Sequence, residues 1–262
     1  MTKQRRSIVR PSELTPPLNS RPPPRAQMTN LLLASLPIKD YHRVCRSLDR
    51  TSLVLKVVLH KPSEPITDLY FPGDGFCSIL TVLRDGSMVE VATVGREGML
   101  GVSAILDGAQ PPVSLMMVQA ASELAYRMPI DAFRRELARR GAFHELLTRY
   151  ASAHMAFVMQ STACNAKHSV EQRLARWLLL ARDRVAADEF PLTQEFAAMM
   201  LGASRPMVSV VAGVLQKSGL ISYHRGVVRI VNRRKLERAS CECYQVTTDL
   251  LAKVTGRTLA DA

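Results

Sequence analysis

The side chains with the most specific chemistry lie at the start of a short helical segment near the C-terminus. Ser204 and Arg205 open this segment, and Met207 and Ser209 follow at positions that its apolar face leaves exposed. An arginine can donate two hydrogen bonds to a guanine edge, and a serine hydroxyl can serve either base type. These four side chains are therefore predicted to contact base edges in duplex DNA, with Arg205 as the main contact.

A helix, a tight turn and a second helix would hold these side chains in place. Residues 192–201 have the pattern of the first helix, which Thr193 can cap because its hydroxyl accepts an unpaired first-turn amide. Gly202-Ala203 would form the turn, and Pro206 is tolerated near the start of the second helix, where an amide proton is dispensable. A helix-turn-helix can place the first residues of its second helix in a major groove.

A hairpin after the second helix completes the pattern of a winged helix-turn-helix. Two short apolar runs flank Arg225-Gly226, as in a hairpin. Residues 168–238 carry 12 lysines and arginines against 6 aspartates and glutamates, an excess that suits a polyanion. Contacts to phosphates position a protein without reading sequence. We expect such contacts from Thr193, Gln194, Lys217, His224 and Arg225.

The N-terminal half has a different pattern, which predicts an antiparallel β-roll. Between residues 53 and 127, short apolar runs alternate with turns of glycine, proline and aspartate. Many short strands with regular turns favour two sheets folded together in a jelly-roll-like arrangement. The predicted fold class is therefore α+β, with the roll first, a long helix next and the winged helix-turn-helix last.

The long helix is predicted to be amphipathic. Its apolar positions recur every three or four residues and form a single stripe, which needs a partner surface. The stripe can pack on its own roll or on a second copy across a two-fold axis. We expect a homodimer whose interface is the stripe of Phe143, Leu146, Leu147, Tyr150, His154, Phe157 and Ser161.

In this order, β-roll, long helix and winged helix-turn-helix resemble the cyclic-AMP receptor protein/FNR (CRP/FNR) family of bacterial transcription regulators. The resemblance covers about residues 30–240 and is most specific over Leu192–Ile221. Family members contact DNA from a Ser-Arg-Glu start of the second helix, which Ser204 and Arg205 match. Proline replaces the glutamate, and Val210 stands where a second arginine is common, so the usual half-site is not expected. The resemblance implies a sequence-specific regulator of double-stranded DNA, with RNA polymerase as a further partner.

With this resemblance, the chain divides into five predicted segments. No run of 18 apolar residues occurs, and no apolar segment follows the N-terminal arginines, so we expect a cytoplasmic protein without a membrane span or secretory signal. The segments are a disordered, basic, proline-rich arm at 1–28, a cyclic-nucleotide-binding-like sensor roll at 29–140, a dimerisation helix at 141–167, the winged DNA-binding domain at 168–240 and a C-terminal tail at 241–262.

The same resemblance argues against a cyclic-AMP site. Members that bind the nucleotide hold its ribose with the Glu of a Gly-Glu-Leu segment and neutralise its phosphate with a following Arg. Gly101-Val102-Ser103 and Pro112-Val113 occupy these places, so a buried phosphate would lack its counter-charge. A pocket for another small molecule, or for none, stays open. Its lining would include Arg96, Glu97, Gly101, Val102 and Val113, although Arg96 and Glu97 can also be a solvated loop pair.

The five cysteines suit neither a disulfide framework nor an iron–sulfur cluster. No cysteine precedes Cys45 and no Cys-x-x-Cys spacing occurs, whereas FNR-like members ligate their cluster with several N-terminal cysteines. Cys241 and Cys243 are close together but lack two further ligands nearby in the sequence. They can form a thiol switch or be two ordinary thiols, and no metal or other cofactor is predicted.

Two other classes of protein remain as alternatives. Cupin-type metal enzymes also use a double-sheet roll, but they need a cluster of histidines and carboxylates, and residues 53–127 contain only His60. No enzyme is therefore predicted. The second alternative is a sensor or partner protein with a vestigial helix-turn-helix, against which Arg205 and the basic wing argue.

Overall fold

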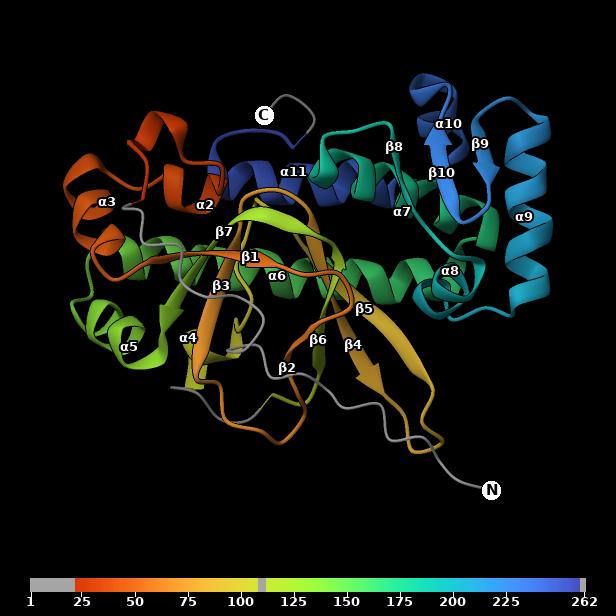
Figure 1. Ribbon diagram of the computed structural model, residues 1–262. Helices are drawn as coiled ribbons and strands as arrows, with labels where there is room; N and C mark the ends of the chain where they lie inside the picture. Colours follow the sequence, from red (N-terminus) through yellow and green to blue (C-terminus); the bar gives the residue numbers. More distant parts are fainter. Residues whose placement is uncertain (1–21, 108–111, 260–262) are drawn as a thin grey trace.

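The computed structural model describes residues 22–107 and 112–259, which form a β-roll at one end and a helical region at the other (Figure 1). The long helix α6 (Ala142–Lys167) runs beneath the roll and reaches the helical region. The order of the parts is the predicted one. A roll of antiparallel sheets with short helices comes first, the long helix follows, and the helix-turn-helix is last. The predicted α+β class is thus confirmed.

Two antiparallel sheets make up the roll. Their strand orders are β1-β7-β3 and β2-β6-β4-β5. The apolar run at residues 53–59 is divided between β1 and β2, because the chain turns at Lys56, where φ is +67°. The strands are β1 (Asp49–Leu53), β2 (Val58–His60), β3 (Asp68–Pro72), β4 (Phe76–Val82), β5 (Met88–Val94), β6 (Leu115–Ala120) and β7 (Ser122–Pro129).

Short helices close one end of the roll, and a buried amide fastens one of them, α2. Asn30 caps α2 because its Oδ1 accepts from the Leu33 amide at 2.9 Å. Its Nδ2 donates to the carbonyls of Pro72 at 2.8 Å and Gly98 at 2.9 Å. The helical segments on this part are η1 (Arg25–Gln27), α2 (Leu31–Ala34), α3 (Ile38–Cys45), α4 (Ser103–Asp107) and α5 (Ile130–Ala138).

The winged part begins with α7, which shares its apolar core with the roll. Phe76 of β4 packs edge-on against Trp177 of α7, with ring centroids 5.9 Å apart. The elements here are α7 (Val170–Val185), β8 (Glu189–Pro191), α8 (Gln194–Leu201), α9 (Arg205–Lys217), β9 (Ile221–His224), β10 (Val227–Ile230) and α10 (Arg233–Ala239). Among the described residues, no single helix is long and apolar enough to span a membrane, and the bent pair α8 and α9 passes only on combined length and composition.

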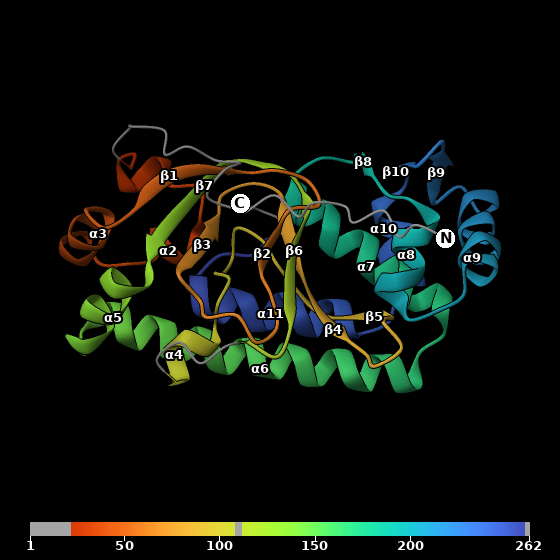
Figure 2. The ribbon, with the colours of Figure 1, turned by 60° about the horizontal axis from the view of Figure 1, so that its bottom comes forward.

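Both predicted terminal segments need correction. The segment 241–262 contains the helix α11 (Cys243–Thr255), which lies along α6 (Figure 2). Its buried side chains recur every three or four residues, and this pattern mixes threonines with apolar residues, which hides it in the sequence. At the other end, Met28 is buried and Arg25 donates to the Leu36 carbonyl at 2.8 Å, so the end of the predicted arm is folded. Residues 1–21 lie outside the described residues.

Candidate DNA-binding surface

The turn between α8 and α9 has the geometry of a helix-turn-helix. The two helices are bent by 103° at the turn, where Gly202 adopts a φ of +55° that glycine accepts without strain. Thr193 caps α8 by accepting from the Phe196 amide at 3.2 Å, and Ser204 caps α9 by accepting from the Met207 amide at 3.4 Å. The Thr193 cap predicted from the sequence thus sets the start of α8, and Ser204 sets the start of α9 in the same way.

Burial on α9 separates an inner face from an outer one. Val208, Val211, Ala212 and Leu215 are buried in the core of the winged part. The side chains predicted to contact DNA all lie at exposed positions, and they are Thr193, Gln194, Ser204, Arg205, Met207, Ser209, Lys217, His224 and Arg225. The sequence pattern therefore assigned the outward side of these elements correctly.

Arg205 is available for a partner outside the chain. Its side chain is 65% exposed, and its nearest acid is Glu195, with Nη2 and Oε2 3.8 Å apart. A surface pair at this distance contributes little to stability, so the guanidinium can exchange it for a better acceptor. Beside it, Gln194 donates from Nε2 to the Ser209 hydroxyl at 3.1 Å, which links the starts of α8 and α9.

The wing is a tight hairpin whose tip lies close to the start of α8. Arg225 and Gly226 have positive φ values of +48° and +78°, as a two-residue hairpin turn requires. The Leu192 amide donates to the Gly226 carbonyl at 2.8 Å. Arg225 at the tip is thereby held near Thr193, and Lys217 lies at the far end of α9.

Two exposed residues of α9 were missed as candidate contacts. Val210 is 65% exposed and Val214 is 41% exposed, and they continue the outward face that begins with Met207. The spacing of three and then four residues was the available signal. Because valine methyl groups can contact the methyl group of thymine, this face can add apolar contacts to the hydrogen bonds of Arg205.

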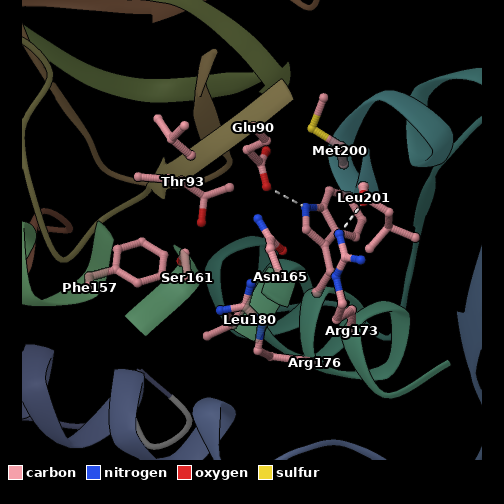
Figure 3. Close-up of a pocket in the computed structure, with 13 residues that line it drawn as sticks. Glu90, Thr93, Phe157, Ser161, Asn165, Arg173, Arg176, Leu180, Met200 and Leu201 are labelled. Carbon is pink, nitrogen blue, oxygen red and sulfur yellow. Dashed lines mark hydrogen bonds between the residues drawn. The ribbon is translucent and has the colours of Figure 1, made fainter. Parts of the chain in front are cut away.

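A buried contact fastens the winged part to the roll (Figure 3). Trp177 donates from Nε1 to Glu90 Oε1 at 2.8 Å, and Ser78 donates to the other oxygen of Glu90. Burial raises the pKa of Glu90 to about 7, although both hydrogen bonds favour the charged form. Figure 3 shows Arg173 and Arg176 of α7 beside this contact, and Arg173 donates to the Leu201 carbonyl of α8.

The five residues expected around an effector pocket do not converge. Glu97 is 2% exposed and pairs with Arg184 of α7 at 2.7 Å, so it forms part of the contact between roll and winged part. Arg96 donates to the carbonyls of Asp183 and Leu259. These two residues are therefore not a solvated pair.

The other three expected lining residues also differ from the prediction. A side chain at Gly101 would come within 2.4 Å of Leu69, so this glycine occupies the packed interior of the roll. Val102 is half-buried against the same core, whereas Val113 is 90% exposed. The spacing from the family pattern placed these residues in one pocket, but β-roll packing sends them to different environments.

The stripe predicted as a dimer interface packs against other residues of the same chain. The seven residues from Phe143 to Ser161 are each at most 7% exposed, and several of them pack into the core of the roll. Burial also lowers the pKa of His154 to about 4, and its ring lies between those of Tyr150 and Phe157. These side chains cannot also cover a second copy in this arrangement, which corrects the predicted interface.

Comparison with known proteins identifies the winged part. Residues 172–239 match the Crp-like helix-turn-helix domain family. No curated protein sequence gives a significant match.

Solved structures of similar fold extend over most of the chain. A CRP-family transcriptional regulator from Thermus thermophilus is 21% identical, with a TM-score of 0.59 over 80% of this chain and 99% of that chain. FixK2 from Bradyrhizobium japonicum is 16% identical, with a TM-score of 0.58 over 74% of this chain and 98% of that chain. The c-di-GMP-responsive regulator CLP of Xanthomonas campestris is 15% identical, with a TM-score of 0.59 over 75% and 100%. Residues 172–239 are therefore a Crp-like helix-turn-helix domain, and the chain has the fold of the CRP/FNR family of transcriptional regulators.

Proposed function

We propose that this protein is a transcription regulator that binds specific sites in double-stranded DNA. The observation that carries the proposal is the exposed start of α9, where Ser204 caps the helix and Arg205 is 65% exposed, with only a loose surface pair to Glu195. The basic wing tip lies beside the start of α8 and can contact a phosphate. A cytoplasmic location and RNA polymerase as a partner follow from the family and belong to the same proposal.

Selection of bound fragments from a genomic library by the purified protein tests this function. We expect a preferred site, and we expect Arg205→Ala to weaken binding there by roughly 1–3 kcal/mol while weak sequence-independent binding persists. Arg139→Ala is the matched control, because Arg139 is an exposed arginine at the end of α5, remote from α9. Absence of any preferred site would favour a partner protein with a vestigial helix-turn-helix.

The proposal includes a homodimer, but through a different face of α6 from the one predicted. Met155 and Met159 are 57% and 62% exposed, and they are large apolar side chains on one side of the helix. Together with Ser152 and Thr162, which are also exposed, they follow the alternating spacing of three and four residues that coiled-coil seams use. Because Ser152 and Thr162 have small side chains, a second copy of α6 can approach this side of the helix closely. A two-fold dimer would present two α9 helices to successive major grooves.

Light scattering after size exclusion chromatography tests the dimer. The unmodified protein is expected to have twice the mass of the chain, and Met155→Glu with Met159→Glu is expected to yield monomers, because like charges would face each other across the seam. Val113→Glu is the control, since Val113 is also highly exposed but lies on the roll. If the variant with both substitutions keeps the mass of a dimer, the interface lies on another part of the chain.

No particular effector is part of the proposal. The residues that would grip a cyclic nucleotide in family members are replaced here, and Glu97 is already paired with Arg184. DNA selection without added ligand therefore separates two cases. A preferred site found under these conditions indicates a regulator that binds without an effector, and a site that appears only with cell extract indicates a missing one.

A further inference from the structure

Four side chains that can bind a metal meet beside the joint between α6 and α7. Cys164 and His168 stand four residues apart at the end of α6, and Cys241 and Cys243 lie just before and at the start of α11. One ligand atom of each residue lies within 4.8 Å of all the others. The two pairs are more than 70 residues apart in the sequence, so the fold alone brings them together.

Distances within this cluster match the edges of a tetrahedral zinc site. The sulfur atoms of Cys164 and Cys241 are 3.5 Å apart, and Cys243 Sγ lies 3.5 Å from His168 Nδ1. Zinc bonds of about 2.3 Å to sulfur and about 2.0 Å to nitrogen separate tetrahedral ligand atoms by about 3.5–3.8 Å. A zinc ion therefore fits between these atoms with only small side-chain movements.

Neighbouring groups orient the cluster for a metal. His168 Nε2 lies 3.2 Å from Glu242 Oε2, and metal-ligating histidines commonly donate their second N–H to a carboxylate. This hydrogen bond would leave the lone pair of Nδ1 directed at the cluster. Gln160, one helical turn before Cys164, donates from Nε2 to Cys243 Sγ at 3.0 Å.

Burial and charge also suit thiolate ligands. Cys164, Cys241 and Cys243 are at most 4% exposed, and buried thiolates need a compensating cation. The guanidinium of Arg176 lies close enough to Cys164 to favour a thiolate there. His168 is 18% exposed at one edge of the cluster, which leaves a path for an ion from solvent.

We propose that Cys164, His168, Cys241 and Cys243 form a zinc site. Three cysteines and one histidine fill all four positions of a tetrahedral ion, which is the ligand set of structural zinc rather than of catalytic zinc. On binding, each thiol releases its proton to solvent and a Zn–S bond forms. This site is independent of the proposed DNA binding, since its occupancy is measured without DNA.

The proposed zinc site lies where the end of α6, the start of α7 and the start of α11 meet. His168 directly precedes Ser169, whose side chain and backbone form the capping box that starts α7. The ion would therefore fasten the start of α11 to the end of α6 at the point where the chain enters the winged domain. Removal of the ion would loosen the joint and the start of α11, whose remaining turns stay packed along α6.

Elemental analysis of the full-length protein, reduced, loaded with zinc and freed of excess metal, tests the site. About one zinc ion per chain is expected. Protein loaded with cobalt(II) instead should show thiolate-to-metal charge-transfer bands and the intense visible bands of a tetrahedral site. Substoichiometric zinc, or a cobalt spectrum without thiolate bands, would overturn the proposal.

Two variants and a control locate the metal. Cys241→Ala and His168→Gln should each lose most of the bound zinc, and the second is the milder change because His168 is partly exposed. Cys45→Ala is the matched control, since Cys45 is a buried thiol among the roll residues and should leave the zinc content unchanged. Full zinc retention in Cys241→Ala would place the ion elsewhere. A Cys164–Cys241 disulfide that forms on exposure of the zinc-loaded protein to air would also overturn the proposal.

Thermal unfolding gives a readout that does not depend on any variant. A strong chelator should lower the melting temperature of the zinc-loaded protein by at least about 5 °C, because the metal stabilises only the folded chain. Readdition of zinc should restore the melting temperature. An unchanged melting temperature on complete removal of the metal would mean that no structural zinc is held.

Discussion

Trp177 of the winged domain donates its indole N–H to the carboxylate of Glu90 in the roll, with Nε1 and Oε1 2.8 Å apart. Both side chains are less than 10% exposed. The contact therefore lies inside the core that the two parts share, where it joins α7 to β5. Burial raises the pKa of its acid, Glu90, to about 7, so the charge of this group changes with pH near neutrality.

Glu90→Gln should stabilise the protein more at pH 7.5 than at pH 5. The pKa of Glu90 is raised to about 7 by burial, so between about pH 4.5 and 7 the folded chain keeps a proton that the unfolded chain releases. Stability from this group falls as pH rises through that window and stays low above it. In urea unfolding, the gain from the variant should grow by roughly 1–3 kcal/mol between the two pH values. Glu123→Gln, at an exposed position of β7, should show no such growth.

His154→Gln should make the free energy of unfolding depend less on pH below about pH 6. Burial lowers the pKa of His154 to about 4, so between about pH 4 and 6.5 the unfolded chain holds a proton that the folded chain lacks. This group therefore makes stability rise with pH, in the opposite direction to Glu90. The variant should lose stability overall but depend less steeply on pH below 6, as measured by urea unfolding. A variant profile parallel to that of the unmodified protein would contradict the assignment.

Arg184→Met should destabilise the protein strongly, by about 3–5 kcal/mol. Arg184 and Glu97 are both at most 2% exposed, and loss of the arginine would leave a buried carboxylate without its partner. Adding Glu97→Leu should recover much of the loss, because a pair of apolar side chains needs no desolvation of charge. Chemical unfolding of both single variants and the double variant measures the coupling. Additive losses would show that the two residues act independently.

Asn30→Ala should cost about 2–4 kcal/mol of folding stability. One amide serves three backbone groups here, since it caps α2 and donates to the carbonyls of Pro72 and Gly98. An alanine would leave these groups buried without the partner they now have. Asn165→Ala, at an exposed position of α6, should change stability by less than about 0.5 kcal/mol in the same unfolding experiment.

Val210→Ala should weaken binding only at sites that offer a thymine to the outward face of α9, if the proposed function holds. The side chain is 65% exposed and can contact the C5-methyl group in the major groove. Each thymine of the preferred site is replaced in turn by uracil. At one position this should weaken binding of the unmodified protein by up to about 1 kcal/mol and leave binding of the variant unchanged. Equal losses for both proteins at every position would exclude this contact. Ser222→Ala, exposed on β9, serves as the control.

Several features could be predicted because they depend on local sequence. The helix-turn-helix follows from Thr193, Gly202 and Ser204, whose cap and turn preferences act within a few residues. The exposed side of α9 follows from its apolar spacing. The strands of the roll follow in the same way from short apolar runs between turns, apart from the turn at Lys56 that divides one of them.

Contacts between distant segments could not be predicted in this way. The stripe on α6 indicated that a partner surface exists, but periodicity is the same whether the roll or a second chain supplies it. Arg96 and Glu97 were expected near an effector pocket or as a solvated pair because they lie close to Gly101 in the sequence, whereas their partners lie on α7 and after α11. The helix α11 escaped notice because threonines occupy several of its buried positions.

The sequence by itself determined the class of fold, the order of the parts and the outward face of the DNA-binding helix, since hydrophobic periodicity and capping operate over one or two turns of chain. Only the tertiary structure decided which face of α6 is covered, which charges are paired between roll and winged domain, and that Cys164 and His168 meet Cys241 and Cys243. Packing of the whole chain settles such contacts, because burial and ion pairing depend on distances in space that spacing along the chain does not encode.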